Sequence, residues 1–397
     1  MFRLLNNPAK GAKPDLESMR RFQTRDNYAW NEAKGVGYFR NLNPQASPIK
    51  RASLWEVGKY YLFKHKNATP PHPLPFVDTN FHALYAPKPS IVWLGHSSLL
   101  VAYHDVKILI DPVFSDYASP YPFINRAFKA GKKWRAQDFG RIDLVLITHD
   151  HYDHLDYPTI TALRGQSAHF ITPLGVGAHL RHWGIEADKI TELGWWESVE
   201  LQSLIESSAD SHKAFCLRGD YAESSAKCAV SLPLESDEAK SRAHTLQGAR
   251  LSSVPSQHSS GRGLEWDRSL WCAYVLELGG VKIFLSGDGG YSSHFKEIGK
   301  RFGGVDLAAL ENGQYNSAWA YSHSFTSQVF EEARELGAKM VLPIHYGRFV
   351  AGSHAWNEPL QNLLRLCDEA GLPVSVPRLG EVYEIGSPPL RSPWWEL

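Results

Sequence analysis

Cysteine, net charge and long apolar runs are all scarce in this sequence. Its 397 residues hold four cysteines, none in a Cys-x-x-Cys pair, which excludes a disulfide framework and a cysteine-rich structural zinc site. No apolar stretch reaches the length that spans a bilayer, and the N-terminus lacks the apolar core of a signal peptide. We therefore predict a cytoplasmic protein without a signal peptide or transmembrane segment, with peripheral contact at the inner membrane face as an open alternative.

The charges balance, since 42 lysines and arginines face 42 aspartates and glutamates. A chain without net charge has no overall positive field to gather a nucleic-acid backbone, so no nucleic acid is expected as a partner. The expected substrate is a small molecule or a lipid. The sequence contains no Gly-x-Ser-x-Gly motif that would supply a serine nucleophile, and it gives no indication of the oligomeric state.

A cluster of metal-ligand residue types follows the apolar segment 142–147. It comprises His149, His151, Asp153 and His154. Alternate residues of an extended chain face the same way, so His149 and His151 can bind one ion, while Asp153 and His154 reach a second past a turn. Imidazole nitrogen and carboxylate oxygen are ligands that suit zinc. The sequence therefore predicts two divalent metal ions, with zinc favoured and manganese or iron as alternatives.

Three further ligand types stand at the ends of later apolar segments. His258 follows a predicted strand at 249–254, Asp288 follows the segment 281–286, and His345 follows the segment 340–344. A single histidine or aspartate at a strand end is more often a structural group than a ligand. Four such strand ends in one chain indicate a shared centre.

Taken in this order, the ligand types resemble those of the metallo-β-lactamase superfamily across residues 90–350. Short segments are similar to the N-acylphosphatidylethanolamine-hydrolysing phospholipase D branch, namely 93–98, 111–115, 194–197, 257–262, 287–291 and 344–349. The resemblance implies two groups of metal ligands, one of His149, His151 and His258 and the other of Asp153, His154 and His345. It also implies that Asp288 bridges the two ions.

The same resemblance implies an α/β fold of the αββα sandwich type, with two mixed β-sheets flanked by helices. We predict an N-terminal extension over 1–88 that wraps the core, and a hydrolase domain over 89–397. An insertion is predicted at 203–248, with a flexible surface loop favoured over a lid. Strands are predicted at 90–95, 98–103 and 106–111, and helices at 157–163, 175–182 and 326–337.

Hydrolysis is the reaction that this ligand set predicts. Two close divalent ions can share a hydroxide whose pKa is lowered towards neutrality, which provides a nucleophile. His151 is a neutral ligand where the flavodiiron branch carries a glutamate, which argues against an oxidoreductase. Asp153 and His323 are the predicted catalytic residues.

Substrate contacts are predicted for Arg262, Tyr315 and His323. His323 stands where the phospholipase branch has a histidine near the substrate phosphate, although a hydrogen bond at a helix entry is an equal alternative. Arg262 has the planar fork that suits phosphate, with an ordinary surface arginine as the alternative. His96 is predicted to be a buried structural residue, and Asp150 and Asp156 to orient the cluster or to cap the following helix.

The leading hypothesis is a binuclear metal-dependent phosphodiesterase that acts on a phospholipid-like, N-acylphosphatidylethanolamine-type substrate. The alternative within the superfamily is a lactonase or esterase. A mononuclear iron persulfide dioxygenase and a non-catalytic homologue are further alternatives. Loss of ligands would mark the non-catalytic homologue, and all seven expected ligands are present.

Overall fold

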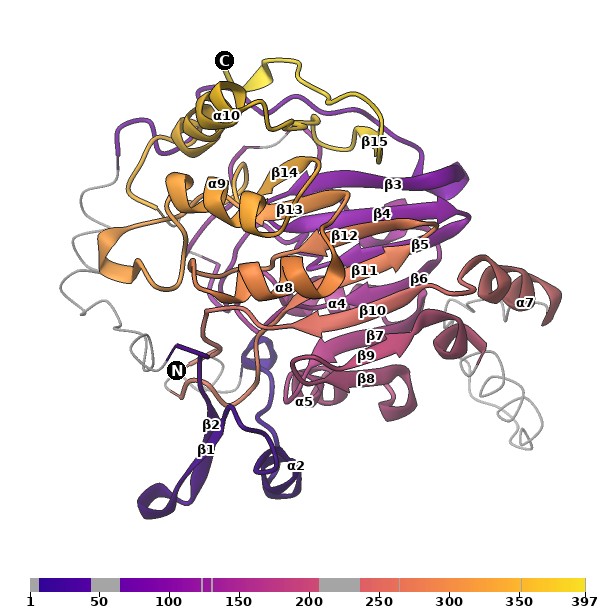
Figure 1. Ribbon diagram of the computed structural model, residues 1–397. Coiled ribbons are helices and arrows are strands. Elements are labelled where there is room, and N and C mark those ends of the chain that lie inside the picture. Colours follow the sequence, from indigo (N-terminus) through magenta and orange to yellow (C-terminus); the bar gives the residue numbers. More distant parts are fainter. Residues whose placement is uncertain are drawn as a thin grey trace.

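Two mixed β-sheets face each other and carry helices on their outer sides (Figure 1). This arrangement is seen in a computed structural model, which describes residues 7–43, 65–122, 124–129, 131–206, 236–263, 265–350 and 352–396. The predicted αββα sandwich is confirmed.

The first sheet has seven strands in the order β15-β3-β4-β5-β6-β7-β8. Its strands are β3 (Ala86–Gly95), β4 (Ser98–His104), β5 (Val106–Ile110), β6 (Ile142–Leu146), β7 (Ser167–Pro173), β8 (Ile190–Leu193) and β15 (Val382–Glu384). Strands β15, β3, β4 and β5 pair antiparallel, and β5 to β8 pair parallel. The three strands predicted first along the chain are present, and β3 starts earlier than expected.

The second sheet has six strands in the order β14-β13-β12-β11-β10-β9. Its strands are β9 (Ser198–Glu200), β10 (Arg250–Val254), β11 (Ala273–Leu278), β12 (Val281–Leu285), β13 (Leu307–Glu311) and β14 (Val341–Ile344). Both β10 and β12 pair antiparallel with β11, so they run in the same direction, and β12, β13 and β14 are parallel. The carboxyl ends of β10, β12, β13 and β14 therefore meet at one edge of the sheet.

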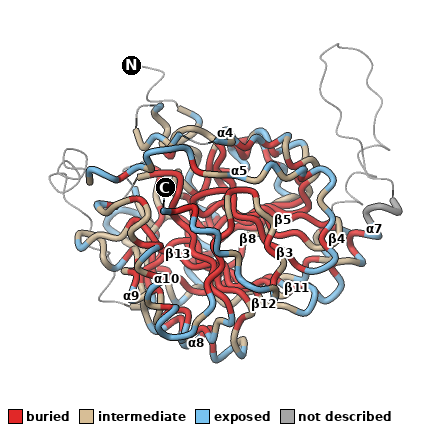
Figure 2. Tube along the Cα trace, turned by 90° about the horizontal axis from the view of Figure 1, so that it is seen from above, coloured by how far each residue is buried: buried red, intermediate tan, exposed pale blue. Residues whose placement is uncertain are grey.

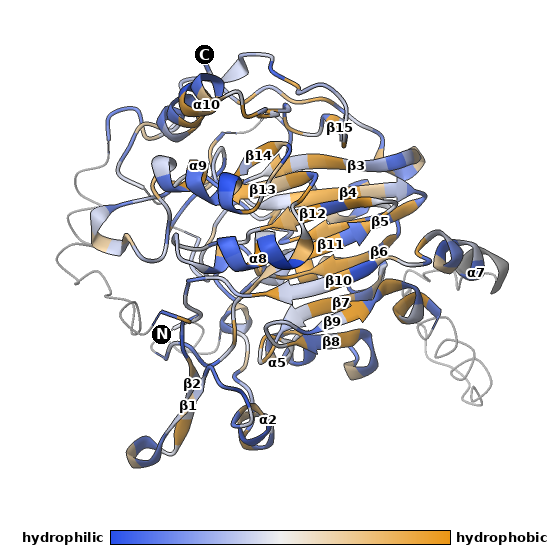
Figure 3. Cartoon of the chain, in the orientation of Figure 1, coloured by the Kyte–Doolittle hydropathy of each residue, from blue (hydrophilic) through white to orange (hydrophobic). Residues whose placement is uncertain are grey.

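Successive side chains of a strand point to opposite faces of the sheet, and this divides the core into two layers. In β3, Ile91 and Trp93 pack between the sheets, whereas Val92 and Leu94 pack under the helices of the outer face. A strand covered on both faces is apolar at consecutive positions, as these four residues are. Figure 2 shows the buried interior enclosed by exposed loops and helices, and Figure 3 shows the apolar strands behind the hydrophilic outer sides of α8 and α9.

The helices begin and end at positions that the sequence marks. Helices α4 (Tyr157–Leu163) and α5 (Gly177–His182) pack on the first sheet, and α8 (His294–Phe302), α9 (Thr326–Glu335) and α10 (Glu358–Ala370) lie against the second (Figure 1). Helix α10 has Pro359 in its first turn and ends at Ala370, and it is followed by Gly371, whose φ of 69° is readily adopted by glycine.

The described part of the predicted N-terminal extension packs on the core. It contains η1 (Pro8–Lys10), α2 (Leu16–Phe22), β1 (Tyr28–Asn31), η2 (Glu32–Lys34), β2 (Val36–Phe39) and η4 (Phe81–Ala83). The β1-β2 hairpin projects from the body, and Phe22, Tyr28 and Phe39 form an aromatic cluster with Leu270 and Trp271. The boundary at residue 88 stays a prediction.

The predicted insertion at 203–248 is described only in part, because residues 207–235 lie outside the described residues. Its later part forms α7 (Ser236–Thr245). Arg242 joins α7 to the first sheet, since its Nη1 lies 3.1 Å from Oδ2 of the buried Asp143. In the described ranges, no helix combines the length and apolar character needed to cross a membrane.

Candidate metal centre

Three imidazole rings converge where β6 and β10 end. His149 and His151 come from the loop after β6, and His258 follows β10. Nδ1 of His151 lies 3.0 Å from Nε2 of His149 and 3.1 Å from Nε2 of His258. One nitrogen from each ring therefore faces a common point, as the resemblance implied for the first group of ligands.

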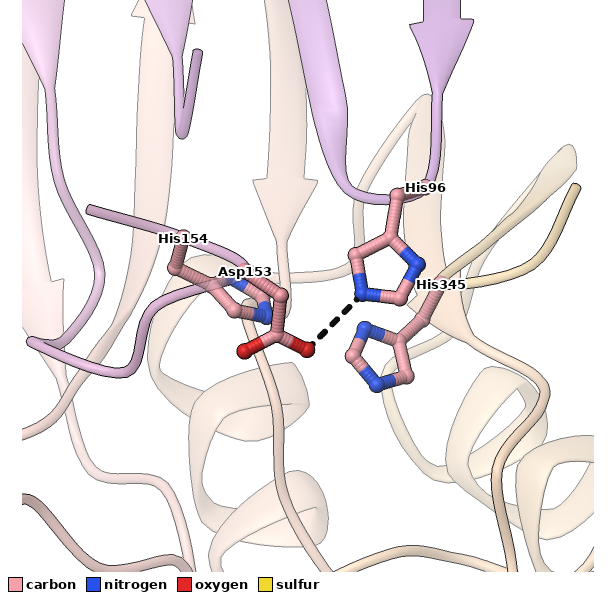
Figure 4. Close-up of side chains that lie close together, drawn as sticks. All are labelled: His96, Asp153, His154 and His345. Atoms are coloured by element: carbon pink, nitrogen blue, oxygen red, sulfur yellow. Dashed lines mark hydrogen bonds and ion pairs between the residues drawn. The ribbon is translucent and has the colours of Figure 1, made fainter. Parts of the chain in front are cut away.

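Figure 4 shows a second group of possible ligands. His96, Asp153, His154 and His345 bring their ligand atoms within 4.8 Å of one another. His345 follows β14, and His96 stands in the turn between β3 and β4. Nε2 of His96 lies 3.0 Å from Oδ2 of Asp153, and the His96 ring is fully buried. His96 thus contacts the Asp153 carboxylate, and its structural role stays a prediction.

Asp288 lies between the two groups. Its Oδ1 is 3.0 Å from Nε2 of His154 and 3.0 Å from Nδ1 of His345. Its Oδ2 is 3.9 Å from Nε2 of His149 and 3.8 Å from Nε2 of His258. Each carboxylate oxygen thus faces one group, and the bridging role of Asp288 stays a prediction.

Gly287 allows Asp288 to reach this position after β12. Its φ is 58°, in the left-handed region that favours glycine. A Cβ atom at this position would lie 2.7 Å from Cβ of Thr148, the residue just before His149. Only glycine lets the two ligand-bearing loops approach this closely.

The donor atoms fit divalent metal ions. Nε2 of His154 and Oδ1 of Asp288 are both buried and have no hydrogen-bond partner, although they are only 3.0 Å apart. Such a pair is satisfied by a third atom that both can coordinate. Burial lowers the pKa values of His149, His151 and His258, which leaves these rings neutral with a free lone pair. Neutral imidazoles with carboxylates are a typical donor set for zinc and related ions.

Further hydrogen bonds orient the rings from behind. Nδ1 of His154 lies 2.8 Å from Oδ2 of Asp111, and Nδ1 of His258 lies 3.0 Å from the carbonyl oxygen of Ser322. Asp111 also accepts hydrogen bonds from the backbone N–H and the hydroxyl of Thr148. Partners of this kind fix the ring orientation of a metal-binding histidine.

Backbone strain gathers at the same place. His96, Asp111 and His345 have φ values of 53°, 42° and 65°. Residues other than glycine adopt this region at a cost, and they cluster at functional sites where surrounding contacts hold them.

Asp150 contacts the ring of His179, which is not a predicted ligand, and Asp156 precedes α4 without a side-chain hydrogen bond that caps it. Asp150 accepts hydrogen bonds from the Ser269 hydroxyl at 2.8 Å and from the Gly261 N–H at 2.6 Å. Asp156 accepts one from the Ser115 hydroxyl at 2.7 Å. Both carboxylates are thus used to hold the loop that carries the predicted ligands.

His323 lies beside both groups and contacts a residue that sequence reasoning missed. Its ring centroid is 5.3 Å from that of His258 and 5.4 Å from that of His345. Its Nδ1 contacts Oε1 of Glu311, the last residue of β13. Burial and the nearby Asp288 carboxylate raise the Glu311 pKa well above its usual range. The sequence does carry a signal for Glu311. It comes directly after the apolar segment 307–310, just as Asp288 comes after the segment 281–286.

Arg262 has contacts that differ from its predicted role. It is buried, and its Nη1 donates at 2.7 Å to the carbonyl oxygens of both Asp150 and Leu155. Its Nε and Nη2 donate to the carbonyl oxygen of Ala9. Arg262 is therefore neither a surface residue nor free to clamp an anion. Its guanidinium ties the metal-ligand loop to the N-terminal extension.

Tyr315 also has a protein partner where a substrate was expected. Its hydroxyl donates to Oε1 of Glu358 at 3.1 Å, and its ring packs on Phe325 and His354. These contacts give no support to the predicted role in substrate binding.

The family is established by comparison with known proteins. A model described as the beta-lactamase superfamily domain matches residues 106–220 and 213–346. The chain belongs to this superfamily and is a metal-dependent hydrolase with a candidate metal-binding cluster of histidine and aspartate.

Individual relatives extend the match. An uncharacterized protein of Mycobacterium tuberculosis is 30% identical over 91% of this chain and 86% of its own length. The N-acyl-phosphatidylethanolamine-hydrolyzing phospholipase D 1 of Caenorhabditis elegans is 29% identical over 70% of this chain and 69% of its own. Among solved structures, the diiron β-hydroxylase CmlA from Streptomyces venezuelae is similar with a TM-score of 0.51 and 16% identity, covering 75% of this chain and 54% of that one. This last similarity shows the fold alone.

Proposed function

We propose that the protein is a phosphodiesterase that hydrolyses a phospholipid-like substrate of the N-acylphosphatidylethanolamine type. The observation that carries the substrate class is the 29% identity to two proteins named as phospholipases of this specificity, over 70% of this chain in each case. The seven converging ligand residues support a retained metal chemistry.

In this proposal the centre holds two divalent ions, with zinc favoured. His149, His151 and His258 would hold one ion, Asp153, His154 and His345 would hold the other, and Asp288 lies where it could serve both. When bound, such ions lower the pKa of water and polarise a phosphoryl oxygen. Asp153 contributes as a charged ligand, because the hydrogen bond from His96 and the nearby His154 outweigh its burial and lower its pKa.

His323 is the group of this chain that can protonate the departing oxygen. Its Nδ1 contacts Oε1 of Glu311, so that Nε2 is the ring nitrogen left to meet a substrate. A histidine oriented in this way beside the ligand groups suits proton transfer to a departing oxygen.

A lipid substrate also requires an apolar approach to the centre. Leu42 and Tyr321 are 49% and 51% exposed. Leu42 follows Asn41 and Tyr321 precedes Ser322, and both of these neighbours are bonded to His258. Each exposed side chain is thus next in sequence to a residue bonded to His258, and we take the pair as candidate contacts with a lipid surface.

The test is hydrolysis by purified protein whose metal content has been measured. We expect release of the headgroup from an N-acylphosphatidylethanolamine in mixed vesicles and cleavage of bis-p-nitrophenyl phosphate, with both activities lost in His151→Ala. Arg365→Ala, which removes only an exposed ion pair with Glu369, serves as the matched control.

Three results would contradict the proposal. Turnover of a lactone panel alone would reassign the protein to lactone or ester hydrolysis. One iron per chain with oxygen uptake would indicate a persulfide dioxygenase. Two bound metals without turnover of any phosphodiester would show that the substrate class is wrong.

A further inference from the structure

Asn41, in the N-terminal extension, contacts the backbone of a metal-ligand residue. It follows β2 and lies 217 positions before His258. Its Nδ2 donates to the carbonyl oxygen of His258 at 2.9 Å, and its Oδ1 accepts from the N–H of His258 at 3.0 Å. The side-chain amide thus pairs with both polar groups of one backbone residue, as a neighbouring strand would.

The Asn41 side chain is itself held firmly. It is 7% exposed, and Nε1 of Trp271 donates to its Oδ1 at 3.2 Å. The Trp271 ring belongs to the cluster that Phe22, Tyr28 and Phe39 form on the core. Packing of the extension on the core therefore holds Asn41 in place.

His258 needs such support because it lies beyond the end of β10, where no sheet hydrogen bond holds its backbone. The Ser322 carbonyl oxygen holds one side of its ring, at 3.0 Å from Nδ1. With the backbone held by Asn41 and Nδ1 held by Ser322, Nε2 is directed at His151.

We propose that Asn41 is a positioning residue of the metal centre, which fixes the His258 backbone so that its ring can coordinate the ion shared with His149 and His151. The inference rests on the proposed two-metal centre. The family match begins at residue 106, so this contribution comes from a part of the chain outside it.

A second contact places the extension on the other ligand-bearing loop. The N–H of Ala12 donates to Nδ1 of His179 at 3.1 Å, and Nε2 of His179 lies 3.3 Å from Oδ2 of Asp150. The extension therefore reaches both loops of the first ligand group, directly at His258 and through His179 at Asp150.

Metal affinity tests the role of Asn41 without any need for turnover. The full chain is stripped with a chelator and titrated with Zn²⁺ against a competing chelator, for wild type, Asn41→Ala and Asn31→Ala. Asn31 is the matched control, because it lies in the same extension and its side chain only accepts from the Lys34 N–H to cap η2. Circular dichroism verifies the fold of each variant.

We expect Asn41→Ala to lower the affinity for one of the two ions about tenfold, as is typical when an outer contact of a ligand is removed. The affinity for the other ion should stay within about twofold of wild type. Asn31→Ala should match wild type. A general loss of packing would lower the affinity for both ions. A loss confined to one ion therefore distinguishes positioning from a structural role.

Equal affinities of wild type and Asn41→Ala for both ions overturn this inference and leave the proposed function intact. If wild type binds no divalent ion, the proposed centre fails and the inference fails with it. If Asn41→Ala does not fold, Asn41→Asp replaces it. This variant keeps the acceptor for the His258 N–H and sets a carboxylate oxygen against the His258 carbonyl. We expect the same loss, and an affinity within twofold of wild type overturns the inference.

Discussion

Replacing Arg262 by alanine distinguishes its observed contacts from the anion-binding role that its sequence context predicts. The guanidinium donates at 2.7 Å to the buried carbonyl oxygens of Asp150 and Leu155, and its Cζ lies 4.0 Å from the centroid of the Tyr152 ring. Each carbonyl left without a donor costs about 1 kcal/mol, and the lost stacking costs about 1 kcal/mol more. We therefore expect a loss of about 3 kcal/mol in the free energy of unfolding.

Urea unfolding of the metal-free protein, followed by tryptophan fluorescence, measures this loss. Arg365→Ala is the control, because its ion pair with Glu369 is exposed and its removal should change stability by less than about 0.5 kcal/mol. The reasoning is refuted if Arg262→Ala unfolds at the wild-type urea concentration while its KM for a phosphodiester rises. That result would restore the role of anion clamp.

Three other perturbations have defined outcomes. Asp111→Asn should weaken metal binding about 10- to 100-fold, because it removes the carboxylate behind His154, and unchanged affinity in a chelator competition would contradict this role. Burial lowers the pKa of His294 from 6.5 to about 3. Below pH 6.5 the unfolded chain therefore takes up a proton that the native state does not, and the free energy of unfolding decreases as the pH is lowered. Lowering the pH from 7 to 5 should therefore reduce the free energy of unfolding by about 2 kcal/mol less in His294→Gln than in wild type. Urea unfolding at both pH values measures this, and the same reduction in the two proteins would disprove it. Combined replacement of Leu42 and Tyr321 by serine should lower hydrolysis of a vesicle substrate while leaving bis-p-nitrophenyl phosphate turnover unchanged, and an equal effect on both substrates would argue against lipid contact.

The ligand-bearing loops could be predicted because each follows a buried strand within a few residues. The loop after β6 carries its ligands within a few residues, so local spacing alone indicated a metal site. His258, Asp288 and His345 were recognisable for the same reason, since apolar strands end just before them. Parallel strand direction then places these residues at one edge of the sheet.

Contacts between distant segments could not be predicted in this way. Arg262 is 107 positions from Leu155, and Asn41 is 217 positions from His258. Both pairs depend on how segments far apart in the chain pack together, and the residues near them in the sequence do not indicate a partner. An arginine near a predicted phosphate site was therefore interpreted by its chemistry, whereas its actual partners are backbone carbonyl oxygens.

The predicted ligands are spread along the chain, so the complete set that could select one metal ion exists only late in synthesis. His258 follows His151 by 107 positions, and His345 comes later still. At typical rates of synthesis, His345 emerges from the ribosome roughly 10 to 40 seconds after His154. During that interval the nascent histidine-rich loop can meet any divalent ion, but it lacks the geometry that discriminates among them. Selection of the metal is thus a property of the finished chain and of the cellular supply at that moment.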